Sequence, residues 1–213
     1  MIEDALFTYC VDHTDKEDAV LENIARQTHL KVLKPRMISG PVQGKFLELQ
    51  TKMLKPRLVL EIGTFTGYAA VCMARGLDDM GRLITLDIND ELEEMVRGFF
   101  GSSGVGHKID YRIGNALKLI PKITGNFDMV FIDADKINYS RYYDLVIDRL
   151  NPGGIIFADN ILWSGKVLES HRKKLDKDTA AILAFNRKVQ NDHRVENVIL
   201  PIRDGIMMAR KRT

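Results

Sequence analysis

The sequence has few of the residues that mark a disulfide-bonded, zinc-binding or membrane-spanning protein. Only two of its 213 residues are cysteines, Cys10 and Cys72, and neither lies in a CxxC or Cys/His ligand spacing. A redox pair or zinc site is therefore not expected, and both thiols fit small, partly buried residues in a reducing compartment. No long apolar run occurs, and residues 1–4, which include the acidic Glu3 and Asp4, do not resemble a signal peptide. We therefore expect a cytoplasmic protein without a membrane span.

An excess of one charge is also missing. The chain has 31 Lys and Arg residues against 29 Asp and Glu residues, a net charge of +2. This balance gives no global electrostatic reason to bind nucleic acid or a membrane surface. The apolar content of 45% and charged content of 28% are those of a soluble globular protein. Because no repeat or Gly/Ser/Pro linker divides the chain, we expect one domain over residues 1–213, with a helical cover at 1–56 and an α/β core at 57–213.

The spacing of apolar residues predicts helices in the first third of the chain. Thr14 or Asp15 is placed to cap a helix that runs to Gln27. A turn at Met37–Pro41 precedes a second helix over Pro41–Leu54, with proline in its first turn. The apolar side chains expected to face inward from this second helix are Phe46, Leu47, Leu49 and Met53.

From Leu58 onward, short apolar runs alternate with helical patterns. The candidate strands are Leu58–Ile62, Arg82–Asp87, Ile109–Ile113, Met129–Ile132, Gly154–Ala158, Val195–Leu200 and Gly205–Arg210. The candidate helices are Gly67–Gly76, Asp90–Phe100, Asn115–Ile120, Tyr139–Arg149 and Thr179–Asp192. Most of the first five strands lack polar alternation, which is typical of parallel strands covered on both faces. We therefore predict a doubly wound, Rossmann-like α/β fold with a mostly parallel seven-stranded sheet and an antiparallel hairpin at one edge.

The loop after the first predicted strand has two glycines and an acid. Gly63 and Gly67 have GxxxG spacing, which differs from the dinucleotide GxGxxG motif, and no GK[ST] follows for phosphates. Glu61 lies where it would repel a pyrophosphate but favour an ammonium. Asp87 ends the next strand, where a carboxylate can accept hydrogen bonds from ribose hydroxyls. Two acids without a phosphate cradle suit S-adenosylmethionine, and the alternative is a structural turn with solvent-exposed acids.

Two later predicted strands are followed by side chains with carboxylate or amide oxygens. Asp133 follows the fourth predicted strand, and Asp159 and Asn160 follow the fifth. Because adjacent parallel strands lie about 5 Å apart, these side chains can converge on one cation. Two carboxylates and an amide oxygen suit Mg²⁺, with Mn²⁺ or Ca²⁺ as alternatives, and the lack of His or Cys disfavours zinc.

Lys136 follows Asp133 closely enough to reach an acceptor oxygen held at such a cation. An ammonium beside a divalent cation releases its proton more readily, because like charges disfavour the protonated form. Lys136 is therefore a candidate general base for a hydroxyl that attacks the sulfonium methyl in line, with the cation as Lewis acid and template. The alternative is a surface lysine that pairs with Asp135.

An ordered set of motifs covers nearly the whole chain. They are Met37-Ile38-Ser39, Gln43–Leu47, Glu61–Tyr68, Thr85–Asn89, Phe131–Lys136, Asn138-Tyr139, Asp159–Gly165 and Asp204-Gly205. This set resembles the cation-dependent class I O-methyltransferases, the family that includes caffeoyl-CoA and catechol O-methyltransferases, and most of all its short bacterial members. The resemblance implies methyl transfer to a small aromatic vicinal diol of the catechol, caffeoyl or flavonoid type. It also implies a homodimer, and N-terminal helices that cover the acceptor pocket.

The resemblance further assigns roles to individual residues. It implies that Asp133, Asp159 and Asn160 hold the metal, and that Lys136 and Asp133 lie in the catalytic centre. The cofactor contacts it implies are Met37, Ser39, Glu61, Gly63, Thr64, Gly67, Ala69, Asp87, Ala116, Asp133 and Asp135. Trp163 with its neighbour Ser164, and Tyr139, are candidates to contact the aromatic acceptor, and wall packing is the alternative for both rings.

Three positions depart from the family pattern. Ala69 stands where a serine often helps to hold the cofactor carboxylate, and Asn115 stands where Asp or Pro is frequent. Arg203 replaces a small residue beside the expected acceptor mouth. These departures leave individual contacts to the cofactor and acceptor open, but none removes an implied metal ligand.

Other functions remain open at this point. A tRNA hydroxyuridine O-methyltransferase would need a basic face, for which the sequence offers His171–Lys174, Lys177 and the terminal Arg210–Arg212. An NAD-dependent oxidoreductase is disfavoured because GxGxxG and a Tyr-x-x-x-Lys pair in a suitable helix are both missing. A binding-only relative is disfavoured because the metal and lysine positions are complete.

Overall fold

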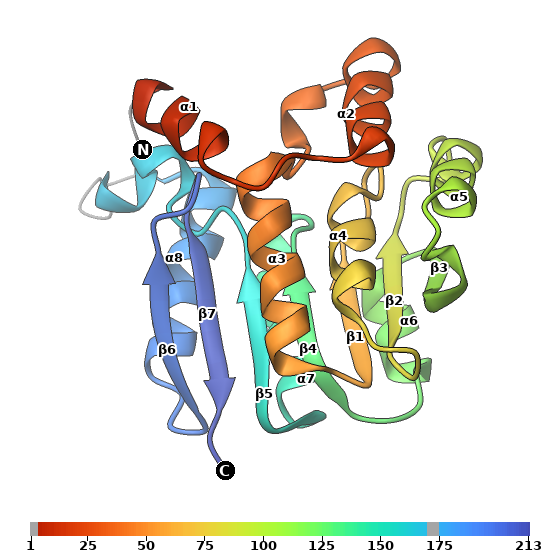
Figure 1. Cartoon of the computed structure of the whole chain (residues 1–213). Helices are drawn as coiled ribbons and strands as arrows, with labels where there is room; N and C mark the ends of the chain where they lie inside the picture. The colour runs from red at the N-terminus through yellow and green to blue at the C-terminus, as the bar shows by residue number, and fades with distance from the viewer. Residues whose placement is uncertain (1–3, 170–174) are drawn as a thin grey trace. The chain divides into compact units, whose positions relative to one another are not determined.

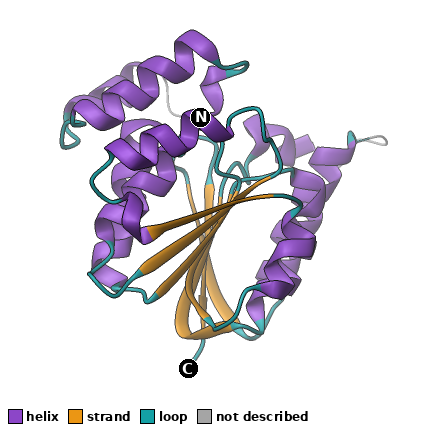
Figure 2. Ribbon diagram, turned by 90° about the vertical axis from the view of Figure 1, so that its right-hand side faces the viewer, coloured by secondary structure: helices purple, strands orange, loops and turns teal. Residues whose placement is uncertain are grey.

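The computed structural model describes residues 4–169 and 175–213, and it confirms the doubly wound α/β fold (Figure 1). The seven strands follow the order β3-β2-β1-β4-β5-β7-β6, and Figure 2 distinguishes them by colour from the helices. The chain forms two compact units that divide between Asn115 and Ala116. They are described separately, and one domain over residues 1–213 stays a prediction.

In the first unit, β1 (Leu58–Ile62), β2 (Arg82–Asp87) and β3 (Ile109–Ile113) have the predicted bounds. The strands run parallel, with Glu61 opposite Thr85 and Asp87 opposite Ile113. Parallel strands end at the same edge of a sheet, so the segments that follow β1 and β2 leave the sheet together. This edge positions the candidate cofactor residues.

The helices of the first unit begin with α1 (Asp4–Asp12) and α2 (Ala19–Lys31). The predicted cap of α2 is wrong, because the Asp18 carboxylate accepts the Leu21 N–H at 3.1 Å and therefore caps the helix. The Thr14 hydroxyl instead donates to the Cys10 carbonyl at 2.6 Å, at the end of α1. The remaining helices of this unit are η1 (Pro35–Met37), α3 (Gly40–Leu54), α4 (Tyr68–Gly76), α5 (Glu93–Ser102) and η2 (Gly106–Lys108).

The buried face of α3 differs from the predicted apolar stripe. Leu47 is buried, but Leu49 is 47% exposed and Met53 is 69% exposed. The helix packs on α4 through a stripe of small and polar residues. A Cβ on Gly44 would lie 2.6 Å from a ring carbon of Tyr68 and 2.8 Å from the sulfur of Cys72. Because the helix packs through this stripe, apolar spacing alone wrongly placed Leu49 and Met53 inward, whereas Leu47 is buried as predicted and Phe46 is half-buried.

In the second unit, β6 (Val195–Leu200) and β7 (Ile206–Lys211) form the predicted antiparallel hairpin, shown side by side in Figure 1. β4 (Phe127–Ile132) and β5 (Leu150–Ala158) are parallel and begin earlier than predicted. The helices are α6 (Ala116–Leu119), η3 (Ile120–Lys122), η4 (Lys136–Asn138), α7 (Tyr139–Ile147), η5 (Trp163–Glu169) and α8 (Lys177–Gln190). Within residues 4–169 and 175–213, no helix is both long and apolar enough to cross a bilayer.

Asp192, just after α8, is a carboxylate of the second unit whose hydrogen bonds favour its ionised form. Its carboxylate accepts hydrogen bonds from Arg194 at 2.6 Å and from the Tyr143 hydroxyl at 3.0 Å. The Arg194 hydrogen bond is the main cause that holds the pKa of Asp192 well below its ordinary value. A lowered pKa in the folded state stabilises the protein above the unfolded-state pKa of about 4, and this stabilisation is lost as pH falls through the folded-state pKa.

Replacing Asp192 by Asn is expected to lower the melting temperature at pH 7 by about 2–4 °C, because roughly 1 kcal/mol of charge-assisted bonding is lost. The difference from wild type should shrink as pH falls below about 4. Melting curves between pH 7 and pH 2 test this, with Asp90→Asn, at an exposed position, as the control. Equal melting temperatures of Asp192→Asn and wild type at pH 7 would contradict the assignment.

Candidate active site

The side chain of Lys136, just after the end of β4, makes several polar contacts. It is only 8% exposed, at the start of η4. Its Nζ lies 3.3 Å from Asp133 Oδ1 and 2.9 Å from Asn160 Oδ1. It also donates to the Tyr139 hydroxyl and lies 4.5 Å from the centroid of that ring. The alternative of a surface lysine paired with Asp135 is therefore wrong.

Asp159 and Asn160 lie at the end of β5, next to the end of β4. Ile132 pairs with Ala158, and the Asp159 N–H donates to the Ile132 carbonyl at 3.0 Å. Asp159 is 2% exposed, and its Oδ1 accepts the Asn160 N–H at 2.7 Å. Asn160 has a left-handed backbone (φ 58°), which asparagine tolerates better than most residues. The ends of β4 and β5 are thus adjacent, as the sequence predicted, and the convergence of the three side chains on one cation stays a prediction.

The chemistry of these side chains fits a hard cation. Asp133 Oδ1 and Asn160 Oδ1 already converge on one positive charge, the Lys136 ammonium. The described residues contain no group of three or more His, Cys, Asp and Glu that could hold a metal. The three predicted ligands are two carboxylates and an amide oxygen, a set suited to Mg²⁺, Mn²⁺ or Ca²⁺, and their binding of a metal stays a prediction.

Asp135 has different partners from its neighbours in the same motif. Its carboxylate accepts the Tyr142 hydroxyl at 2.5 Å and the Asn138 amide at 2.5 Å. Burial, and next the bond to Asp135, raise the pKa of Tyr142, which keeps its hydroxyl a donor. The sequence reasoning missed Tyr142, because Asp135 lies before η4, Tyr142 lies within α7, and a spacing of seven residues does not by itself indicate contact.

Tyr139 does not contact an acceptor in the way the sequence suggested. It is 0% exposed, so its ring has no free face on which an aromatic acceptor could stack, and that prediction is wrong. Its hydroxyl donates to the Asp159 carbonyl at 3.1 Å. Burial, and next the nearby Asp133 and Asp159, raise the pKa of Tyr139 well above its ordinary value, so the hydroxyl stays protonated.

The Trp163–Ser164 segment is held by the turn between β6 and β7. The Ser164 N–H donates to Asp204 Oδ1 at 2.6 Å, and the Leu162 N–H donates to the Asp204 carbonyl at 2.9 Å. At Gly205 (φ 86°) a Cβ would lie 2.4 Å from Leu162 Cγ, so the turn requires glycine. The buried Trp163 indole N–H has no hydrogen-bond acceptor in the part of the chain that the structure describes. Contact of Trp163 and Ser164 with an acceptor stays a prediction.

In the first unit, the two predicted acids have different environments. Glu61 is 0% exposed and accepts a hydrogen bond from the Thr85 hydroxyl, whose oxygen lies 2.5 Å from that of Thr64. Glu61 is therefore not the solvent-exposed acid of the alternative reading. Asp87 is partly exposed and accepts the Phe65 N–H at 2.7 Å and the Asn89 N–H at 2.9 Å. Both carboxylates are fixed at the edge where β1 and β2 end.

Gly67 makes the sharp turn from this edge into α4. It has φ 81°, and a Cβ there would lie 2.6 Å from a ring carbon of Phe100. Gly67, at the N-cap of α4, has no side chain with which to cap the helix, so it leaves the backbone N–H groups of the first turn as donors. Ala69, in that turn, is buried and brings no polar side-chain group, in keeping with the departure from the family pattern.

The other predicted cofactor residues are in varied settings. Ser39 is buried at the start of α3, whereas Met37 is 53% exposed. The Gly63 N–H donates to the Leu86 carbonyl at 2.9 Å. Ala116, in the second unit, is buried at the start of α6. The structure shows where these residues lie, and their contact with a cofactor stays a prediction.

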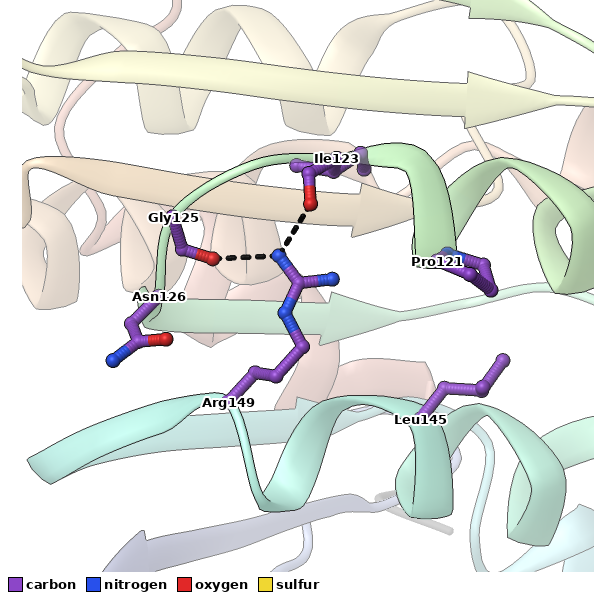
Figure 3. A pocket seen from close by; sticks show the side chains of 6 residues that line it. All are labelled: Pro121, Ile123, Gly125, Asn126, Leu145 and Arg149. Carbon is purple, nitrogen blue, oxygen red and sulfur yellow. Dashed lines mark hydrogen bonds between the residues drawn. The ribbon is translucent and has the colours of Figure 1, made fainter.

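A separate surface hollow lies before β4, at the strand end opposite to Asp133 (Figure 3). Arg149 donates to the carbonyls of Ile120, Ile123 and Gly125 at 2.6–2.9 Å. Its guanidinium also lies 4.7 Å from the centroid of the Phe127 ring. Arg149 therefore has a structural role, and no predicted site residue lines this hollow.

The basic face that a tRNA substrate would need is only partly described. The cluster His171–Lys174 lies outside the described residues. Lys211 donates to the carbonyls of Leu150 at 2.6 Å and Ile147 at 2.9 Å, and Arg210 pairs with Glu196 at 2.9 Å. These two terminal cations are thus already engaged within the fold.

Comparison with known proteins extends over nearly the whole chain. Residues 11–212 match the family described as O-methyltransferase. A caffeoyl-CoA O-methyltransferase of Petroselinum crispum is 33% identical, over 98% of this chain and 91% of that protein. An O-methyltransferase from Bacillus cereus, solved in complex with SAH, has a TM-score of 0.90 at 29% identity, over 98% of this chain and 97% of that chain. The O-methyltransferase TomG from Streptomyces achromogenes, in complex with SAM, has a TM-score of 0.91 at 27% identity, over 100% of both chains.

Proposed function

This chain belongs to the O-methyltransferase family, and on that premise we propose that it transfers the methyl group of S-adenosylmethionine to a hydroxyl of a small aromatic vicinal diol. The observation that carries the proposal is the buried Lys136 ammonium, held by Asp133 and Asn160 where β4 and β5 end. A buried lysine between two oxygen acceptors is placed to exchange a proton with a hydroxyl bound there.

We assign the acceptor chemistry to four residues of the second unit. Asp133, Asp159 and Asn160 would hold a divalent cation, of which Mg²⁺ is the first candidate. Such an ion, when bound, supplies Lewis acidity and a template for two neighbouring oxygens. In its neutral amine form, Lys136 would receive the proton of the reacting hydroxyl and so become the ammonium that Asp133 and Asn160 hold in position. Methyl transfer then needs little further chemistry from the protein beyond orientation.

We assign cofactor binding mainly to the first unit. Glu61 is a buried carboxylate suited to an ammonium, and Asp87 is a partly exposed carboxylate suited to ribose hydroxyls. The uncapped first turn of α4 after Gly67 offers backbone donors to the cofactor carboxylate, which suits a chain that has Ala69 in place of serine. Two similar proteins, those from B. cereus and S. achromogenes, were solved with SAH and SAM.

Transfer of a labelled methyl group to a panel of acceptors tests the proposal. We expect methylation of catechols, caffeate or flavonoids that have adjacent hydroxyls, and none of their mono-hydroxyl analogues. Bulk tRNA is the comparison substrate, and excess EDTA should reduce turnover to near background. Transfer to tRNA alone would reject the acceptor class, and full activity in EDTA would reject the metal assignment. Light scattering in the same buffer tests the homodimer, which is a further part of the proposal.

A further inference from the structure

The hydroxyl of Tyr139 lies where the main parts of the acceptor site meet. It accepts a hydrogen bond from Lys136 Nζ, and its own proton points to the carbonyls of Asp159 at 3.1 Å and Ile132 at 3.3 Å. Ile132 directly precedes Asp133, and Asp159 directly precedes Asn160. One buried hydroxyl therefore links the candidate base to the backbone beside the candidate metal ligands.

We propose that Tyr139 is the positioning residue of this site, whose hydroxyl fixes the Lys136 ammonium between Asp133 and Asn160. A lysine side chain has several rotatable bonds, and its attraction to one carboxylate does not set the direction of its hydrogen bonds. Three acceptors around Nζ fix the directions of its hydrogen bonds, and the third of these acceptors is the Tyr139 hydroxyl. The inference rests on the proposed function for its catalytic consequence, but its geometric content stands independently.

The ring of Tyr139 is held by contacts that do not involve its hydroxyl. It packs edge-on against Phe185 of α8, with centroids 5.4 Å apart. Replacement by phenylalanine therefore removes the hydroxyl and leaves the ring packing in place. Tyr143, one turn later in α7, provides a matched control because its ring also packs edge-on against Phe185, at 6.2 Å. Its hydroxyl bonds to Asp192, away from the candidate site.

The full-length variants Tyr139→Phe and Tyr143→Phe separate positioning from packing. We expect Tyr139→Phe to lower kcat about 10–100-fold on a catechol acceptor and to weaken Mn²⁺ binding, measured by calorimetry without acceptor, about tenfold. Its KM for S-adenosylmethionine should stay within about threefold of wild type, because the change is confined to the acceptor side. Tyr143→Phe should leave kcat and Mn²⁺ affinity within about threefold of wild type. Crystal structures of both variants should show the contact between Lys136 and Asn160 lost only in Tyr139→Phe.

Each outcome supports or overturns the assignment. An unmoved Lys136 ammonium in Tyr139→Phe, or equal losses of kcat in both variants, would overturn it. If wild type methylates no diol but the Lys136 contact is lost only in Tyr139→Phe, the proposed function fails and the positioning role holds. If wild type methylates diols and Tyr139→Phe matches its kcat and Mn²⁺ affinity, the positioning role fails alone.

Discussion

Replacing Lys136 by methionine is expected to lower kcat about 10²–10⁴-fold, the range associated with loss of a positioned general base. Methionine keeps most of the length of the buried side chain and removes the charge that Asp133 and Asn160 contact. Binding of S-adenosylmethionine should change little, since the cofactor contacts are assigned mainly to the other compact unit. Initial rates at saturating cofactor and acceptor, with cofactor calorimetry on the same preparation, measure the two effects separately.

The matched control for this experiment is Lys188→Met. Lys188 pairs with Asp144 at 2.6 Å on the surface of the second unit, and neither of the two is a predicted site residue. It should keep wild-type kcat and nearly wild-type stability, because exposed ion pairs contribute little. Activity of Lys136→Met above about a third of the wild-type value would remove Lys136 from the proton-transfer step.

The second large effect is expected at Asp159. Asp159→Ala should lower divalent-metal-stimulated turnover about 10³-fold, because a Lewis acid accounts for several kcal/mol of transition-state stabilisation. Asp159→Asn separates charge from local structure, since an amide oxygen can still accept the Asn160 N–H that Asp159 Oδ1 accepts at 2.7 Å. The asparagine variant should therefore fold like wild type, need more Mg²⁺ for half-maximal activity and keep its affinity for S-adenosylmethionine. Metal titrations of kcat give these values.

Asp144→Asn, which removes an exposed carboxylate of the same unit, should leave the metal titration unchanged. The metal assignment would be abandoned if Asp159→Ala kept the full stimulation by Mg²⁺. It would also be abandoned if Asp144→Asn and Asp159→Asn shifted the titration equally, because that result would point to general electrostatics rather than a ligand.

The limits of the strands show how much of the sheet can be predicted from local sequence patterns. β1, β2, β3 and β6 have the predicted limits because each is a short run bounded by turn-forming or charged residues. β5 begins earlier than predicted, because Leu150 pairs with Phe127 across a register shift and the intervening Pro152-Gly153 looked like a turn. A segment that contains turn-forming residues such as proline and glycine can still belong to a strand when it pairs with a neighbouring strand.

Residue chemistry at the strand ends was enough to select Asp133, Asp159 and Asn160 and to place them at neighbouring strand ends, because parallel strands end at one edge. The family motifs were likewise readable from their order along the chain. The partners of Lys136 and Tyr139, and the buried face of α3, were decided only in three dimensions. Such contacts depend on strand register and helix packing, which join residues far apart in sequence, and no local spacing records which side chains then meet.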